Sequence, residues 1–363
     1  MLLKLLTGMD QGRFCNSVIS LTGRGVMAER IEALGIPVFT CDMVPGHFSV
    51  AGFARLLRHL RAIQPDLVQT WLYHADLLGG VAARLLGIKP VLWNIRHSNL
   101  DWDKNKAHTL KVVRLNAKLS TRLPARIICN SANSAAIHQA AGFSRQRFVI
   151  LPNGFDTDAF QPSATSRTAV RQELGIAADV PLIGLVARFD PQKNHQGFVH
   201  AASLLIAKRP DAHFLLAGGG VDPENAALAE WLSASPQLRG HVHLLGRRDD
   251  IPRLTATLDL AVCSSWGEGF SNAVGEAMCC EVPCVVTDVG DCADLVGDTG
   301  WVIKAGDMQA MSDKLHLALT LSATERQTLG QRARQRVIER YSLPAIVRRY
   351  ESLYLETIIE GNR

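Results

Sequence analysis

Two short segments in the second half of the chain combine charged side chains with residues typical of tight turns. In residues 188–194 (RFDPQKN), Arg188 and Lys193 flank a turn that follows an apolar run. Two cations at such a turn can neutralise a diphosphate and stabilise it as a leaving group. Taken alone, the segment also fits an ordinary strand–loop–helix connection whose charges are solvated.

The second segment, residues 268–276 (EGFSNAVGE), follows another apolar run and carries a carboxylate at each end. We expect Asn272 to cap a helix through Glu276, whose first-turn amides form a site for a diphosphate. Gly269 lets the backbone approach an anion closely. Glu268 and Glu276 can then face one ligand, one near a sugar hydroxyl and the other near ribose hydroxyls. The spacing alone also fits two unrelated surface glutamates.

These segments belong to a repeating order of short apolar runs and longer amphipathic stretches. The sequence predicts strands at residues 15–21, 36–41, 66–71, 90–95, 126–129, 147–151, 181–187, 212–218, 242–246, 259–265, 283–288 and 300–304. Strand–helix alternation of this kind indicates parallel sheets wrapped by helices. It occurs twice, on either side of a loop rich in turn-forming residues at 152–165.

We therefore predict an α/β chain of two doubly wound, Rossmann-like domains, whose ligands bind at the carboxyl ends of strands. The predicted domains are residues 1–155 and 156–342, and an amphipathic helix over 343–360 is expected to pack back on the first domain. The 363 residues suffice for two domains, and 47% hydrophobic with 20% charged residues is a globular composition. No run reaches the roughly 18 uninterrupted apolar residues that a membrane span needs.

The positive charge of the chain is concentrated in its first half. Residues 1–155 contain 19 Lys and Arg residues against 8 Asp and Glu residues, and the basic residues are densest between Lys104 and Arg126. A solvated helix face explains this density, and so does attraction to an anionic membrane surface or an anionic acceptor. Nucleic acid is not an expected partner, because no aromatic-interleaved basic motif or zinc-finger spacing accompanies the charge.

Together, the two segments resemble glycosyltransferase family 4, whose members have the GT-B fold of two Rossmann-like domains facing a central cleft. VARFDPQKN (186–194) matches the R-x4-K element of the family, and EGFSNAVGE matches its E-x7-E element. LLGRRDDIPRL (244–254) and VPCVVTDVG (282–290) match the surrounding strands and turns. The resemblance covers nearly the whole chain.

The resemblance assigns a role to each residue of the two segments. It implies that Arg188 and Lys193 hold the diphosphate of the donor and that Glu276 binds the ribose hydroxyls. It implies that Glu268 contacts the donor sugar. The backbone amides of the intervening residues complete this donor site: Gly269, Phe270, Ser271 and Asn272.

The resemblance also assigns roles to two histidines of the first domain. VLWNIRHSN (91–99) is similar to the strand of the family that ends in histidine followed by Ser or Thr, which places His97 at the donor sugar and the reaction centre. His74 lies at another strand end and is assigned to the acceptor side, although a capping or packing role fits it equally well. The catalytic set implied is His97, Glu268, Arg188 and Lys193.

The reaction implied is transfer of a hexosyl group, with retention of configuration, from a UDP- or GDP-sugar to a lipid-linked or polysaccharide acceptor in bacterial cell-surface glycan biosynthesis. No cofactor and no metal ion are expected, either at Asp101–Asp103 or at the cysteines of 279–292. The eight cysteines fit a cytoplasmic chain, with a peripheral place on the inner face of the membrane. A non-hydrolysing sugar-nucleotide epimerase and an inactive sugar-nucleotide-binding protein are the alternatives.

The beginning of the chain departs from the family pattern. The family opens with a strand and a glycine-rich turn, whereas residues 1–6 (MLLKLL) already have the pattern of the first helix. Either the start codon was assigned too late or the chain lacks that strand, which would leave buried ladder groups unpaired. We favour the late start and expect that about 20–25 upstream residues would raise soluble yield and activity.

Overall fold

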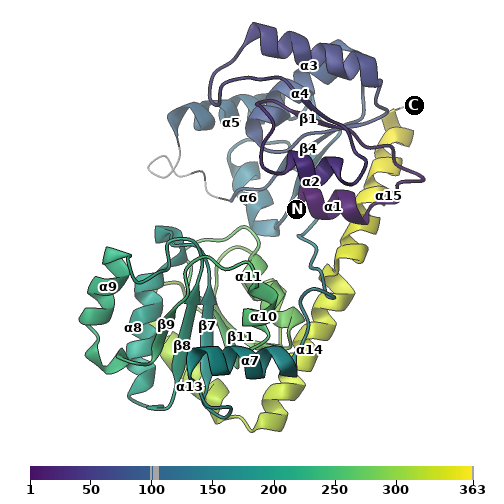
Figure 1. Cartoon of the computed structure of the whole chain (residues 1–363). Coiled ribbons are helices and arrows are strands. Elements are labelled where there is room, and N and C mark those ends of the chain that lie inside the picture. The colour runs from purple at the N-terminus through teal and green to yellow at the C-terminus, as the bar shows by residue number, and fades with distance from the viewer. Residues whose placement is uncertain (99, 101–105, 362–363) are drawn as a thin grey trace. The chain divides into compact units, whose positions relative to one another are not determined.

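The computed structural model describes residues 1–98, 100 and 106–361, which form two compact units (Figure 1). The first unit contains Met1–Gly154 together with the C-terminal segment from Leu343, and the second unit is Phe155–Ser342. Each of the two units is an α/β structure of parallel strands and helices, so the predicted fold class is confirmed.

The first unit has two parallel sheets. One pairs β1 (Val18–Ser20) with β2 (Val38–Thr40). The other has the order β3-β4-β5-β6, with β3 Val68–Gln69, β4 Val91–Ile95, β5 Arg126–Cys129 and β6 Phe148–Ile150. The helical elements are α1 Leu2–Gly8, α2 Ala28–Glu32, α3 Val50–Ile63, α4 Tyr73–Leu85, α5 Ala107–Leu119, α6 Ala132–Ala140, the short 3-10 turn η1 Arg145–Arg147, and α15 Leu343–Gly361.

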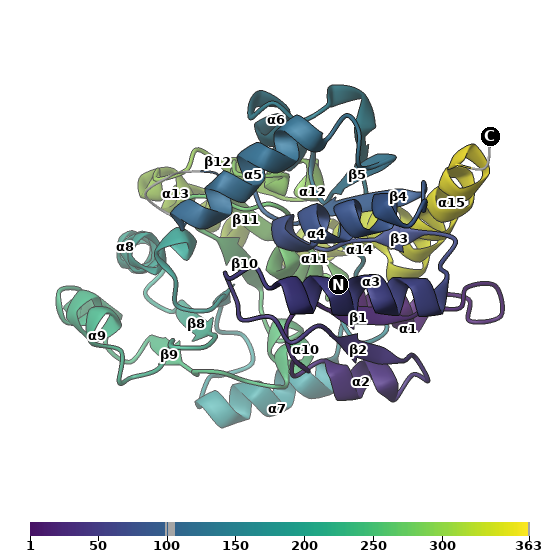
Figure 2. The same ribbon diagram turned by 90° about the horizontal axis from the view of Figure 1, so that it is seen from above.

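Helices α3, α4 and α5 lie side by side over the four-stranded sheet, as Figure 2 shows from above. Every residue of β4 is buried, which suits its run of apolar side chains at the centre of a covered sheet. Helix α3 turns Leu56 and Leu60 to the core and leaves Arg58 and Arg61 exposed, as its amphipathic pattern predicts.

The C-terminal helix α15 completes the core of the first unit. Val347 and Tyr350 of α15 pack with Leu5 of α1 and with Leu92 and Ile128 of the sheet. The approach of the two helices is close, because a Cβ atom at Gly8 would lie 2.9 Å from Val347 Cγ2. Residues near both ends of the chain thus stabilise one sheet.

The second unit is built on one parallel sheet of order β12-β11-β10-β7-β8-β9. Its strands are β7 Leu182–Val186, β8 His213–Ala217, β9 Val242–Leu244, β10 Leu260–Cys263, β11 Cys284–Thr287 and β12 Trp301–Ile303. Its helical elements are α7 Ala164–Leu174, η2 Pro191–Lys193, α8 His195–Ile206, α9 Ala226–Ser233, η3 Pro236–Leu238, α10 Ile251–Thr255, α11 Asn272–Cys279, α12 Cys292–Val296, α13 Met308–Thr320 and α14 Ala323–Tyr341.

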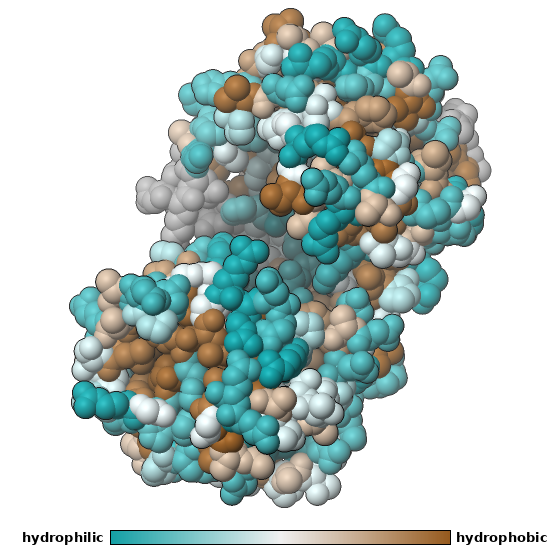
Figure 3. Space-filling model, viewed as in Figure 1, coloured by the Kyte–Doolittle hydropathy of each residue, from teal (hydrophilic) through white to brown (hydrophobic). Residues whose placement is uncertain are grey.

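Two apolar clusters cover the two faces of this sheet. One contains residues of α8, α9 and α13, and the other contains residues of α7, α11 and α14. On the visible faces of both units, hydrophilic side chains alternate with smaller apolar areas (Figure 3).

Each of the twelve strands lies within one of the apolar runs from which it was predicted. Among the described residues, no helix combines the length and the apolar character that crossing a bilayer requires.

Candidate active site in the second unit

The turn after β7 positions the first pair of charged residues. Asp190 caps the 3-10 turn η2, because its Oδ1 accepts a hydrogen bond of 2.9 Å from the amide of Gln192. Its other oxygen, Oδ2, accepts bonds from Arg188, of 2.7 Å from Nη2 and 3.1 Å from Nε. The Arg188 side chain is 68% exposed, so the guanidinium is oriented by Asp190 and still accessible to a ligand.

A second turn, after β10, is joined to the first by several hydrogen bonds. Asn194 has a left-handed backbone (φ 53°) and caps α8 through Oδ1, while its Nδ2 donates to the carbonyl of Ser264 over 3.2 Å. The Ser264 hydroxyl donates to the carbonyl of Lys193 over 2.9 Å, and the amide of Trp266 donates to the carbonyl of Gln192 over 2.8 Å. These bonds fix the ends of two neighbouring strands relative to each other.

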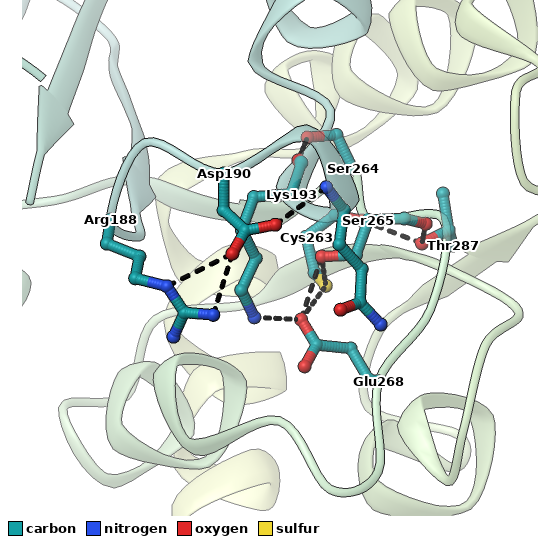
Figure 4. A network of polar contacts seen from close by, with 9 residues as sticks. Arg188, Asp190, Lys193, Cys263, Ser264, Ser265, Glu268 and Thr287 are labelled. Carbon is teal, nitrogen blue, oxygen red and sulfur yellow. Dashed lines mark hydrogen bonds and ion pairs between the residues drawn. The ribbon is translucent and has the colours of Figure 1, made fainter. Parts of the chain in front are cut away.

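The joined turns bring Lys193 and Glu268 into contact (Figure 4). Lys193 Nζ lies 2.6 Å from Glu268 Oε1, and the same oxygen accepts a bond of 2.7 Å from the Ser265 hydroxyl. Only 22% of the lysine side chain and 11% of the glutamate side chain are exposed. Figure 4 also shows the Arg188 and Lys193 side chains extending to the same side of the turn. The first charged segment and the beginning of the second therefore form one polar network.

Helix α11 begins at the strand end beside this network. The helix starts at Asn272, so Ser271 occupies the N-cap position, and the expectation that Asn272 is the cap is wrong by one residue. Ser271 makes no side-chain capping bond. The helix thus begins without the serine bond that would occupy its first amides, and these amides are the groups that bind anions at helix N-termini.

The remainder of the second segment is anchored in the core. Phe270 is 6% exposed and stacks on Phe155, with ring centroids 5.9 Å apart. Phe155 in turn lies against α11 at Gly275, where a Cβ atom would be 2.0 Å from the ring. The side chain of Phe270 therefore anchors the segment in the core and leaves the backbone of residue 270 for a ligand. Glu276 is half-buried on α11, outside the network that joins Lys193 to Glu268.

The glycine after β11 closes the network from another side. Gly290 has φ 58°, and a Cβ atom there would lie 2.3 Å from the carbonyl oxygen of Glu268. The loop after β11 therefore packs directly on the backbone of Glu268. Gly269, next in sequence, has its carbonyl 2.8 Å from the same position. Close backbone contact of this kind requires glycine at residue 290.

The two predicted histidines belong to the first unit. His97 follows β4 with an exposed side chain, and its carbonyl accepts a bond of 2.9 Å from the Ser134 hydroxyl. His74 is half-buried at the start of α4, with its ring 5.8 Å from that of His108. Desolvation lowers the pKa of both histidines, and in His74 the nearby His108 lowers it further. Both rings are therefore biased toward the neutral form, which can accept a proton or a hydrogen bond.

The metal-ligating groups considered in the sequence are only partly covered by the structure. Asp101–Asp103 lies outside the described residues. Within the described part of the chain, no group of three or more His, Cys, Asp or Glu side chains is placed to hold a metal ion. All eight cysteines are free thiols, and seven of them are buried.

Sequence reasoning missed the residues that orient the charged side chains. Asp190, Ser264 and Ser265 all bond to the predicted residues, yet each is a common type in a turn. Asp190 precedes proline in a turn, and this is a recognisable capping signal. The two serines end the predicted strand 259–265 and directly follow β10, and this place at a strand end is the signal that could have identified them.

Two known families match the chain. The family described as "Glycosyltransferase Family 4" matches residues 9–159, and the family described as "Glycosyl transferases group 1" matches residues 180–320. The first match lies almost entirely in the first unit, and the second lies within the second unit and contains both charged segments.

Among curated proteins, the chain is similar to the UDP-Gal:α-D-GlcNAc-diphosphoundecaprenol α-1,3-galactosyltransferase of Escherichia coli. The identity is 25% over 314 residues, which cover 84% of this chain and 79% of the relative. It is also similar to the N-acetyl-α-D-glucosaminyl L-malate synthase of Bacillus anthracis, at 30% identity over 193 residues. That match covers 53% of this chain and 49% of the relative, so the chain spans about half the length of this second protein.

Among solved structures, the fold is similar to that of Anabaena Alr3699/HepE in complex with UDP-glucose. The TM-score is 0.80 at 22% identity, with 97% of this chain and 95% of the other covered. Sucrose-phosphate synthase from Thermosynechococcus elongatus gives a TM-score of 0.75 at 18% identity, with 99% and 92% covered. With both halves of the chain matched by family and by fold, this protein belongs to glycosyltransferase family 4 and has the GT-B fold.

Proposed function

We propose that this protein transfers a hexosyl group from a nucleoside-diphosphate sugar to a lipid-linked or polysaccharide acceptor in cell-surface glycan biosynthesis, with retention of configuration. The observation that carries the proposal is the contact of Lys193 with Glu268 beside the start of α11. A cation, a carboxylate and helix amides are thereby gathered at adjacent strand ends. Open parallel sheets bind their ligands at this edge.

In the proposed complex, the donor diphosphate lies between the two cations and the start of α11. Arg188 and Lys193 contact its oxygens, and the amides of residues 269–272 complete the site. Lys193 then divides its three N–H donors between the diphosphate and Glu268. Glu268 Oε2, which makes none of the bonds described above, is the oxygen that contacts a hydroxyl of the sugar. Glu276 binds the ribose hydroxyls.

The cleavage step follows from these charges. As the glycosidic bond to the diphosphate breaks, negative charge grows on the leaving oxygen, and the preorganised cations and amides stabilise it. Because this chain supplies the positive charge itself, we propose that no metal ion and no cofactor are needed. The lowered pKa of His97 favours the uncharged imidazole, which accepts a hydrogen bond from the donor sugar. The acceptor hydroxyl attacks the anomeric carbon from the face that the diphosphate leaves, and its proton passes to an oxygen of the departing diphosphate. His74 lies on the acceptor side.

The relatives favour a UDP-sugar among possible donors. The E. coli relative is named for UDP-Gal and a diphosphoundecaprenol acceptor, and the Anabaena structure holds UDP-glucose. We propose a UDP-hexose as donor and an acceptor linked to a membrane lipid, with GDP-hexose as the alternative donor. Seven buried free thiols are consistent with a cytoplasmic location. A lipid-linked acceptor would place the protein at the inner face of the membrane.

A panel of sugar nucleotides tests the donor. A ligand that binds only the folded protein raises its melting temperature, by an amount that grows with concentration over Kd. We expect UDP-hexoses to raise it in the wild type and not in Arg188→Ala or Lys193→Ala. Transfer to a prenyl-diphosphate glycan, followed by NMR of the anomeric proton, then tests the reaction and its stereochemistry.

The same assay separates the alternatives. Conversion of the donor sugar without an acceptor identifies an epimerase, and donor binding without transfer identifies an inactive binding protein. Transfer that survives a chelator supports metal independence. Equal turnover by wild type and Lys193→Ala would overturn the proposed site.

A further inference from the structure

The helix layer of the first unit presents positive charge without surface carboxylates of its own. Helices α3, α4 and α5 contain seven Lys and Arg residues. Their only acidic residue is Asp76, which is fully buried. The residues proposed above to bind the diphosphate lie in the second unit, and His74 at the start of α4 is the one residue of this layer that the proposed site uses.

The charge is most concentrated on one face of α5. Lys111, Arg114 and Lys118 are spaced three and four residues apart, so their side chains share one side of the helix. All three are exposed, and Leu115 between them is 44% exposed. Arg122 continues the row just beyond the end of the helix. This face therefore pairs cations with an apolar side chain in contact with water.

The loop before α3 and the first residue of that helix present apolar side chains that are more exposed than Leu115. Val44 and Phe48 are each 64% exposed, and Val50 is 76% exposed. The loop is held by buried Met43 at one end and, at the other, by Ser49, whose Oγ accepts a bond of 3.1 Å from the amide of Gly52 as the cap of α3. Its apolar side chains are thus held outward by well-defined structure.

The loop and the cationic face are neighbours. A Cβ atom at Gly46 would lie 3.5 Å from Nε2 of His108, in the first turn of α5. Figures 1 and 2 both show the segment before α3 beside the beginning of α5. The apolar loop is therefore adjacent to the beginning of the cationic helix. We name these neighbouring residues the α5 surface: residues 44–50 with Lys111, Arg114, Leu115, Lys118 and Arg122.

We propose that the α5 surface docks this protein on a bilayer that contains anionic phospholipids. Val44, Phe48 and Val50 enter the boundary between headgroups and acyl chains, and the basic residues contact lipid phosphates. A soluble acidic polysaccharide would account for the cations but not for three exposed apolar side chains beside them. The proposal rests on the proposed function only for its purpose, which is to hold the enzyme where a lipid-linked acceptor lies.

Vesicle co-sedimentation of the full chain, without donor or acceptor, tests this docking. We expect the wild type to sediment with phosphatidylcholine vesicles that contain phosphatidylglycerol and to stay in solution with phosphatidylcholine alone. The double variant Lys111→Glu/Lys118→Glu should weaken binding to the vesicles about 30-fold or more, because each basic residue near the anionic lipid surface contributes to the free energy of binding. Phe48→Ser should weaken it about 10-fold or more through the lost apolar insertion.

Matched variants in the second unit serve as controls. Arg239→Glu/Arg340→Glu changes the net charge by the same amount at exposed positions, and Leu317→Ser removes an apolar side chain that is 46% exposed. Both should bind vesicles as the wild type does, and all variants should keep its melting temperature.

Three results would overturn the proposal. The first is equal binding of the wild type to both vesicle types, or to neither. The second is loss of binding in the charge-reversal control that matches the loss in the α5 variant. The third is binding to a soluble anionic polysaccharide with none to vesicles. Because no glycosyl transfer is measured, failure of the proposed reaction would leave this test intact.

Discussion

The ammonium nitrogen of Lys193 lies 2.6 Å from Oε1 of Glu268, although 75 residues separate the two in sequence. The pair is mostly shielded from water and is reinforced by the Ser265 hydroxyl. A diphosphate that binds Lys193 therefore meets a cation that is already placed and already partly neutralised. Binding of the donor and the position of Glu268 should consequently be coupled.

Replacing Lys193 by alanine should reduce kcat/KM by about 10²–10³-fold, because a preorganised cation at the leaving group is lost. The free energy of unfolding should fall by only about 1–2 kcal/mol, since Glu268 keeps its bond from Ser265. Steady-state kinetics and urea unfolding measure the two effects. Lys208→Ala is the matched control: Lys208 follows the end of α8 and pairs with Asp313 of α13 at an exposed site, so its loss should leave kcat/KM unchanged.

Ser265→Ala should lower kcat more than it raises KM for the donor. The hydroxyl contacts Glu268 alone among the proposed site residues, so its loss loosens the carboxylate without removing a diphosphate contact. A fall of about 10-fold or more is expected for one hydrogen bond to a charged carboxylate. Ser233→Ala provides a control, because that hydroxyl donates to a carbonyl one turn back in an exposed helix. A change confined to KM would contradict a positioning role for Ser265.

Gly275→Ala should destabilise the second unit, although alanine is the better helix former. The added methyl group would meet the Phe155 ring at 2.0 Å, and overpacking of this kind costs about 1–3 kcal/mol. Thermal unfolding measures the loss, and Gly23→Ala, where no atom lies within 4 Å, is the control.

A double variant with Phe155→Ala sharpens this test. Removing the ring makes room for the methyl group, so the two changes together should cost less than the sum of their separate effects. Additive losses would show that Phe155 and Gly275 do not constrain each other.

Asp76 should make stability depend on pH. It is fully buried; Oδ1 accepts a 2.5 Å bond from the Thr70 hydroxyl, while Oδ2 has no partner among the described residues. Desolvation raises its pKa to about 7. A carboxyl whose folded-state pKa exceeds its unfolded value favours folding at low pH, and this contribution disappears as the pH rises through about 7.

Asp76→Asn should remove that dependence. The amide keeps an oxygen for Thr70 and cannot ionise, so the wild type should lose about 2–4 kcal/mol relative to the variant between pH 4 and pH 8. Urea unfolding across this range measures the difference between the two proteins, which cancels the other titrating groups. Parallel curves for wild type and variant would show that Asp76 ionises freely in the folded state.

The strands were predictable because each is a short apolar run between turn signals, and twelve of twelve runs contain one. For a run such as residues 91–95, a strand in a covered parallel sheet is the element that buries every side chain. The carboxyl ends of these strands then indicate where the charged turns lie. Sequence alone therefore locates Arg188, Lys193 and Glu268 at one edge of a sheet.

The contacts within that edge were not predictable, because they depend on the spatial order of strands. β7 and β10 are neighbours although β8 and β9 lie between them in sequence, and only this order brings Lys193 to Glu268. The helix start at Asn272 was missed by one residue, since serine and asparagine have nearly equal N-cap preferences. The bond from Arg188 to Asp190 was not predictable either, because the sequence does not show whether the Asp190 carboxylate binds a neighbour or water.

The C-terminal helix gives the chain an unusual order of assembly. The backbone leaves the first unit after Gly154 and re-enters it at Leu343, where a Cβ at Gly154 would lie 2.9 Å from the Leu343 Cα. In the second unit, the amide of Phe155 donates a hydrogen bond to the carbonyl of Tyr341. A ribosome must therefore finish residues 155–342 before α15 emerges to cover Leu92 and Ile128. The second unit can thus be complete while the first unit still exposes its core, and chaperones would meet the first unit in that state.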